Sequence, residues 1–361
     1  MFLPRGECRY GLPAVRIPLL ALLLSAPAFA DAQGTARLWV GSGYDSNARR
    51  DFVRDDGSGA VAPEPDLVLS AIGAAEGRVR GPSVQATGAY ELGLREFMRL
   101  PTEDVTIQSA NLDGSVAVSR QLAVGLDARG KDRRGGERDY TDLSAEAFAE
   151  WAPDAAVDLR ARGGAHRFIY WDPIGYSFGA SELGLSARYR FDRHHSALLF
   201  GDLGSRIYQS MTHPNPVVAA PPPPDRRRDQ VLGAGAGYSY RGPFTVTLTY
   251  SYTEQDSNSF GETVTRHRLA ATGGFRLPWR LALFAQAAVQ LSRYPDGVYL
   301  SDELNITEDD DTHNAVSLRL VRPVSEHIDA DLRYSLYEDR LPQNGISYLR
   351  QAAWVGLTWR L

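Results

Sequence analysis

The feature of this sequence that most constrains its fold is a two-residue alternation of apolar and polar side chains that returns in run after run. In residues 244–253, aromatic and aliphatic side chains occupy every second position, and threonine and serine occupy the positions between them. Residues 328–337 alternate in the same way, with aliphatic side chains and one tyrosine set against aspartate, arginine and serine. Successive side chains of a strand point to opposite faces, so each run predicts a strand with one apolar and one polar face.

Sixteen runs of this kind follow one another between Thr35 and Leu361, so we expect sixteen strands. They begin near residues 35, 67, 83, 106, 122, 140, 156, 176, 195, 229, 244, 266, 281, 313, 326 and 347. Short turns alternate with longer polar loops, the longest of which are expected near 45–65, 209–228 and 294–311. Alternating connection lengths and an even strand number are typical of a membrane barrel with both chain ends on the short-turn side.

The length of the runs separates a membrane barrel from a soluble sheet protein. A tilted strand needs about 9–11 residues to cross a bilayer, whereas strands of soluble proteins average about 5–6 residues. Aromatic residues near the ends of the apolar faces could form interfacial girdles; they are Trp151, Tyr189, Phe191, Tyr240, Tyr252, Phe275 and Trp359. The fold predicted is an all-β transmembrane up-and-down antiparallel β-barrel of about sixteen strands, with fourteen or eighteen as alternatives.

The first thirty residues have the pattern of an export signal. Arg5, Arg9 and Arg16 precede an apolar stretch at residues 17–24, and Ala28-Phe29-Ala30 fits a cleavage site. We therefore predict a signal peptide at residues 1–30 and one barrel domain at residues 31–361, with only residues 31–34 before the first strand. The destination predicted is the cell outer membrane of a Gram-negative bacterium.

The C-terminal residues Trp354–Leu361 resemble the last strand of bacterial outer-membrane barrels, in which a glycine precedes alternating bulky apolar residues. The resemblance implies that Gly356, Trp359 and Leu361 form the membrane-insertion signal, with the barrel assembly machinery as a partner. Nearer the start, Tyr44-Asp45-Ser46-Asn47 resembles a strand end found in porin-like barrels of polysaccharide export loci. That second resemblance implies periplasmic polysaccharide export proteins as partners.

The polar faces of the strands would line the interior of such a barrel. They carry both signs of charge, which can set ion preference and orient polar solutes, or can pair across strands and brace the wall. The residues predicted to line the lumen are Arg95, Arg129, Arg160, Arg162, Arg188, Arg268, Arg319, Arg333, Asp113, Asp127, Asp158, Asp329 and Asp331.

Signals for catalysis or cofactor binding are weak. The seven histidines show no metal-ligand spacing, and Ser317 and His267 could meet only in one particular strand register. The acidic residues of 294–311 lack the order of a calcium-binding loop. Removing residues 1–30, which hold three arginines and one glutamate, takes the formal net charge from −5 to −7, so we do not expect nucleic-acid binding. We predict no enzyme activity, no metal and no cofactor.

The function expected is an outer-membrane channel with a polar, charge-lined lumen. It would act either as a porin-like pore or as the outlet of an exopolysaccharide export system, with outer-membrane lipid and lipopolysaccharide around it. The alternative is a closed barrel that serves as a surface-binding or envelope-anchoring protein, and an outer-membrane enzyme is a more remote one.

Overall fold

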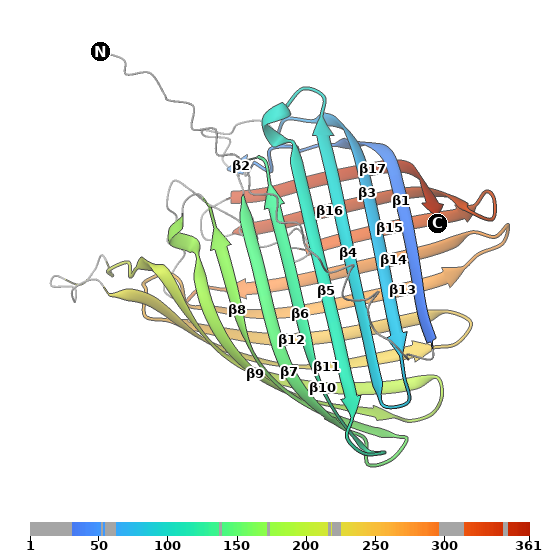
Figure 1. The fold of residues 1–361 in the computed structure, drawn as a ribbon. Helices are drawn as coiled ribbons and strands as arrows, with labels where there is room; N and C mark the ends of the chain where they lie inside the picture. Colours follow the sequence, from blue (N-terminus) through green and yellow to red (C-terminus); the bar gives the residue numbers. More distant parts are fainter. Residues whose placement is uncertain are drawn as a thin grey trace, which may run out of the picture.

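The chain forms a closed β-barrel (Figure 1). The computed structural model describes residues 31–51, 53–54, 63–136, 139–171, 174–215, 218, 225–295, 314–341 and 346–361. Within these residues sixteen long strands pair antiparallel with their neighbours in sequence, and β1 (Asp31–Asp45) pairs with both β3 (Asp66–Arg80) and β17 (Ile346–Arg360). That last pairing closes the ring, so the prediction of a sixteen-stranded up-and-down barrel is confirmed.

The remaining long strands follow in chain order. They are β4 (Val84–Phe97), β5 (Val105–Ala117), β6 (Leu122–Arg134), β7 (Tyr140–Trp151), β8 (Val157–Tyr170), β9 (Phe178–Arg190), β10 (His195–Met211), β11 (Arg226–Arg241), β12 (Thr245–Ser257), β13 (Val264–Arg276), β14 (Ala282–Arg293), β15 (Asn314–Pro323) and β16 (Ile328–Leu341). A two-residue strand, β2 (Val53–Arg54), pairs with the first two residues of β17. Two single helical turns, η1 (Pro101–Glu103) and η2 (Ile174–Tyr176), lie in connections, and no helix in the described residues is long and apolar enough to cross a membrane.

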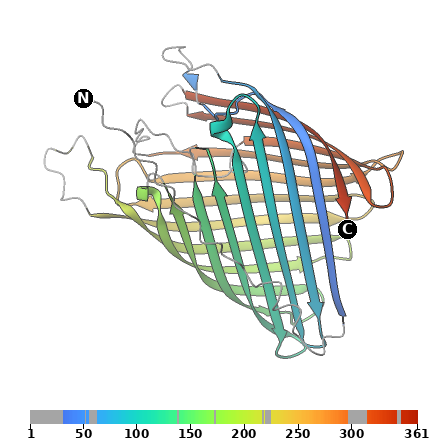
Figure 2. The same cartoon turned by 45° about the horizontal axis from the view of Figure 1, so that its top comes forward.

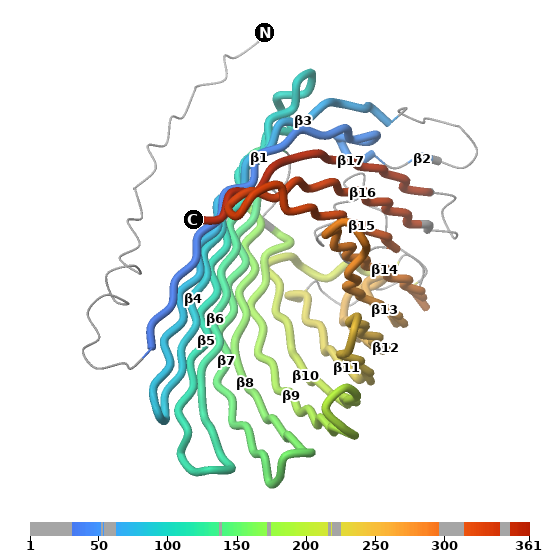
Figure 3. Tube along the Cα trace, turned by 90° about the vertical axis from the view of Figure 1, so that its right-hand side faces the viewer, coloured from blue at the N-terminus to red at the C-terminus, as the bar shows by residue number. Residues whose placement is uncertain are grey.

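The strands form two walls that meet along β1 and β17. Figures 1 and 2 show β1 and β3–β9 on the near side and β10–β17 behind them, running across at a steep angle. Figure 3 shows the same two walls from another side. Strands that cross at such an angle are tilted from the barrel axis, as closure of a sheet into a barrel requires.

The predicted strand starts agree with the structure to within four residues at all sixteen positions. One expectation at the start was wrong: residues 31–34 belong to β1, where they pair with the end of β3. Several strands also run further towards the loop side than expected, so that β10 continues to Met211 and β11 begins at Arg226. The predicted signal peptide, residues 1–30, lies outside the described residues.

The pairing register assigns every strand residue to one of the two faces of the wall. The outward face carries exposed aliphatic side chains, and Leu185 and Leu291 are each 69% exposed. Aromatic side chains gather on this face at the short-turn end, where Tyr240, Phe244 and Phe275 contact one another in sequence at 4.9 and 5.8 Å between ring centroids. An apolar exterior with an aromatic edge is suited to lipid.

The seam between β1 and β17 is packed around one tryptophan. The inward-facing Trp39 is only 5% exposed, and its ring lies over the backbone of Gly41 and Gly356. Trp354 meets Trp39 edge to face, with 6.3 Å between ring centroids. The two glycines leave the space that the large ring needs, so side-chain packing reinforces the hydrogen bonds at the closing seam.

We predict that Gly41→Ala destabilises the barrel by about 1–3 kcal/mol, because overpacking a filled site costs that much. A methyl group there would lie 2.5 Å from the Val355 carbonyl oxygen and 2.6 Å from Trp39 Cζ2. Urea unfolding of protein refolded in detergent, followed by heat-dependent migration on a denaturing gel, measures the effect. Gly73→Ala is the matched control, since a Cβ at Gly73 meets nothing within 4 Å. Equal losses for both variants would contradict this account of the seam.

Candidate functional site

The polar face of the wall is turned to the inside of the barrel. Arg162 on β8 forms an ion pair with Asp202 on β10, across the intervening strand β9. Arg95 on β4 lies over the ring of Trp354 on β17, at 5.8 Å, with β3 and β1 between the two strands. Side chains from non-adjacent strands can meet in this way only inside the curve of the wall.

All thirteen residues predicted to line the lumen occupy this inward face in the strand register. Neighbouring members oppose each other directly at Asp113 and Asp127, at Asp158 and Arg188, and at Arg319 and Arg333. Some are held by local contacts: Arg129 pairs with Asp127 at 3.1 Å, and Arg160 lies 3.8 Å from the centre of the Phe148 ring. Arg268 opposes Ser251 and Gln290 on the neighbouring strands.

A network of alternating charges crosses the middle of the wall formed by β7–β10. Arg162 joins Glu146, at 2.9 Å, to Asp202. Four residues further along β8, on the same face, His166 Nε2 lies 2.6 Å from Asp142, and its Nδ1 lies 3.8 Å from Glu182. In both cases a basic group on β8 joins a carboxylate on β7 to a second one on the other side, Asp202 on β10 or Glu182 on β9, so the charges run around the wall.

A second network lies beside the closing seam. Asp331, whose carboxylate is fully buried, accepts hydrogen bonds from Arg319 Nε at 2.5 Å and from Arg333 Nε at 2.7 Å. The Arg333 guanidinium in turn lies 4.5 Å from the centre of the Trp39 ring. One buried carboxylate therefore neutralises part of the charge of two arginines and positions one of them over the tryptophan.

The Tyr44-Asp45-Ser46-Asn47 segment fastens the loop end of the same seam. Arg350 on β17 makes a buried, bidentate salt bridge to Asp45, with a shortest distance of 2.6 Å. The Asn47 backbone N–H donates to Asp45, and its side-chain amide donates to the Leu349 carbonyl. These contacts tie the end of β1 to β17, so the motif has a structural role in closure.

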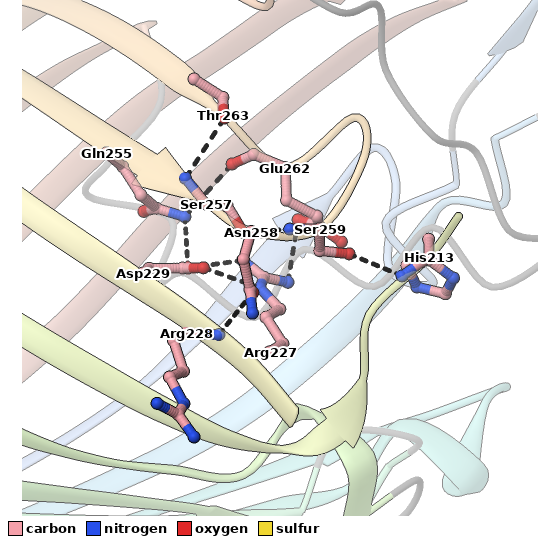
Figure 4. Close-up of polar contacts among 10 residues, drawn as sticks. All are labelled: His213, Arg227, Arg228, Asp229, Gln255, Ser257, Asn258, Ser259, Glu262 and Thr263. Carbon is pink, nitrogen blue, oxygen red and sulfur yellow. Dashed lines mark hydrogen bonds and ion pairs between the residues drawn. The ribbon is translucent and has the colours of Figure 1, made fainter. Parts of the chain in front are cut away.

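A third cluster holds down the loop between β12 and β13 (Figure 4). Arg227, only 8% exposed, pairs with Asp229 at 2.7 Å and with Glu262 at 2.9 Å. Gln255 donates to Asp229 at 2.8 Å, and the Arg227 guanidinium lies 4.0 Å from the centre of the Tyr208 ring. The two carboxylates thus neutralise the positive charge of Arg227 at the loop end of the wall.

Beside the network of β7–β10, the middle of β11 and β12 has no charged side chain on its inward face. The inward residues of β12 are hydroxyl-bearing or amide side chains, and Thr247 exchanges a hydrogen bond with Ser239 of β11 at 3.1 Å. The inward residues on these two strands in the middle of the wall are Gly233, Gly235, Gly237, Ser239, Thr247, Thr249, Ser251 and Thr253. A stretch of small neutral polar groups therefore lies next to the charged network of β7–β10.

Several functional residues were missed in the sequence analysis, above all Asp202 and Arg227. Asp202 shares the inward face with Leu198 and Phe200, and these two apolar side chains obscure the polar phase of β10. The outward phase of the same strand, with Leu199, Leu203 and Ile207, was the signal that could have assigned Asp202 to the interior.

The serine–histidine pair considered in the sequence analysis does not come together. Ser317 faces inward on β15 and His267 faces outward on β13, so the two cannot cooperate. The described ranges also hold no group of three or more histidine, cysteine or acidic residues able to bind a metal ion. The acidic residues at 302–311 lie outside the described residues.

A closed barrel with an apolar exterior and a polar interior defines an outer-membrane β-barrel, and the chain is a protein of the cell outer membrane. No protein-family model matches the sequence, and no curated protein matches it.

Solved structures with a similar fold are outer-membrane proteins. A loop-deletion variant of OmpT, an outer membrane protein of Vibrio cholerae, has a TM-score of 0.46 at 10% identity, covering 91% of this chain and 99% of that one. OccK11 of Pseudomonas aeruginosa has a TM-score of 0.43 at 11% identity, covering 91% and 96%. A bacterial polysaccharide outer membrane secretin has a TM-score of 0.42 at 11% identity, covering 90% and 98%. Identities this low say nothing about the solute of this chain.

We predict that Asp331→Asn costs about 3–5 kcal/mol of stability, because it leaves two arginines without their buried partner. Asp329→Asn is the matched control on the same face of the same strand: its partner Arg360 is half exposed, and such pairs contribute about 0–1 kcal/mol. Urea unfolding in detergent compares the two. Equal stabilities would contradict a bracing role for the Asp331 network.

Proposed function

We propose that the protein is a passive channel for polar solutes across the outer membrane. The observation that carries the proposal is that the ion pairs between described residues run along the barrel wall and not across the lumen. Within the described residues, the ion pairs between strand residues of the inward face join residues of one strand, of adjacent strands or of strands two apart, as in Glu146–Arg162–Asp202, and so follow the wall. Barrels of sixteen strands are wide enough to leave an aqueous channel, and bracing within the wall leaves that width free.

The neutral face of β11 and β12 supports passage of hydrated, uncharged groups as well. Serine and threonine hydroxyls both donate and accept hydrogen bonds, so they can replace water around a polar solute without fixing its charge. Gly237 leaves room beside these hydroxyl groups, whereas the Phe200 ring packs over Gly235.

Export of an exopolysaccharide is the more specific form of this proposal. The resemblance of Tyr44-Asp45-Ser46-Asn47 to barrels of export loci suggested it, with periplasmic export proteins as partners. Because Asp45 and Asn47 are engaged in closing the barrel, the support for export lies in the lumen chemistry alone. A closed barrel with a binding or anchoring role is the competing function.

We predict discrete, reproducible conductance steps when the purified protein is inserted into planar lipid bilayers. A variant with a shortened 212–225 connection tests for occlusion by that loop. The Thr212 N–H bonds the Asp225 carbonyl at 2.7 Å, so the strands are joined below the shortened part and should keep their pairing. Absence of conductance from both forms, with the folded state verified by gel migration, would favour the closed barrel and end the channel proposal.

We also propose that Gly356, Trp359 and Leu361 act as the insertion signal. Leu361 is 85% exposed and its N–H bonds the Ala36 carbonyl at 2.9 Å, so its side chain contributes little to packing. Leu361→Asp should lower the amount of protein in the outer membrane of cells by several fold, while refolding of the purified chain in detergent stays unchanged. Equal loss in both assays would point to a folding defect and count against a signal.

A further inference from the structure

The inward-facing arginines differ sharply in exposure between the two ends of the barrel. At the long-loop end, Arg227 and Arg350 have side chains 8% and 4% exposed and are committed to Asp229, Glu262 and Asp45. Arg133 at the same end is also buried. These guanidinium groups are buried in the wall, so a solute in the lumen has little contact with them.

At the short-turn end the inward-facing arginines are exposed. Each lies at one of the last two inward positions of a strand that runs towards that end, and they are Arg78, Arg80, Arg188, Arg241, Arg276 and Arg360. Arg78 and Arg360 are 54% and 51% exposed. Arg80, Arg188, Arg241 and Arg276 make no ion pair with any residue that the structure describes.

The carboxylates at this end offset only some of these cations: Glu76 pairs with Arg78 at 3.8 Å, and Asp31 opposes Arg80 in the strand register. Asp158 and Asp329 are only 14% and 15% exposed and are already paired with Arg190 and Arg360. Asp331 is fully buried between two arginines. Arg188, Arg241 and Arg276 are exposed and make no ion pair within the described residues, so positive charge remains in excess at the mouth.

The short turns of outer-membrane barrels face the periplasm, so the positive mouth faces that compartment. We propose that this mouth is a collecting site for anionic solutes that carry carboxylate or phosphate groups. The proposal rests on the channel function above and assigns its solute class. Guanidinium groups bind these anions through paired hydrogen bonds, and a mouth of one charge sign raises the local concentration of the opposite ion.

The first experiment measures ion selectivity in planar bilayers under a potassium chloride gradient. The unaltered protein should prefer chloride at about 0.1 M salt, and the preference should fade near 1 M, where the screening length drops to about 3 Å. Arg241→Gln combined with Arg276→Gln should lower the chloride-to-potassium permeability ratio by about twofold or more.

The matched control is Arg293→Gln combined with Arg322→Gln, which removes the same charge from the outward face. The control should leave the permeability ratio unchanged. An equal change in both pairs, or a wild-type channel that prefers potassium or neither ion, would overturn the inference and leave the channel function standing. Absence of any conductance would instead remove the proposed function and the inference together.

The second experiment separates small anions from acidic polymers and tests the sidedness. The sequence has one cysteine, Cys8, within the predicted signal peptide, so Ser83→Cys in the turn after β3 gives a single site for labelling by an impermeant thiol reagent. Labelling from one chamber then identifies the chamber that faces the short turns.

An oligogalacturonate added to that chamber should interrupt the current at lower concentration than from the other side, and a neutral maltooligosaccharide of equal length should not. This result identifies acidic oligosaccharides as solutes, whereas chloride selectivity without such block identifies small anions. Equal block by both oligosaccharides from both sides would contradict a collecting site at this mouth.

Discussion

The structure depends on one constraint: in lipid, every backbone N–H and C=O group must find a partner within the protein. A sheet meets this requirement only when its first and last strands pair, and here that task falls to β1 and β17. The seam carries more than backbone bonds. Trp39 packs over Gly41 and Gly356 on the inside, and the Asp45–Arg350 salt bridge fastens the loop end.

Closure also determines where charge can be placed. Because the outward face of each strand contacts lipid, charged side chains in the middle of the strands lie in the lumen and must be neutralised or hydrated there. The structure uses both solutions. Arg162 and Asp331 belong to networks within the wall, whereas Arg241 and Arg276 are left exposed to water at one mouth. The division between bracing and exposed charge is what gives the lumen its chemical character.

Much of the fold could be predicted because it depends on local pattern. Alternation in residues 244–253 or 328–337 fixes both the strand and its faces, and the lining positions follow from the phase. The partners could not be predicted, since Arg162 meets Asp202 across β9 and Arg95 meets Trp354 across two strands. Such contacts depend on register and curvature, which no single run contains. The same limit applies to Asp45, whose motif suggested a transported solute and whose contacts close the barrel.

The net charge of the chain is a poor guide to the field that a solute meets. The full sequence has a formal charge of −5, which taken alone would favour cations. That sum counts residues at the long-loop end, such as Asp225 and Glu262, together with those of the lumen. Coulomb energies fall with distance and are screened in water within about 10 Å at 0.1 M salt. A solute at the short-turn mouth therefore responds to Arg188, Arg241 and Arg276 beside it, so selectivity in a barrel has to be derived face by face and end by end.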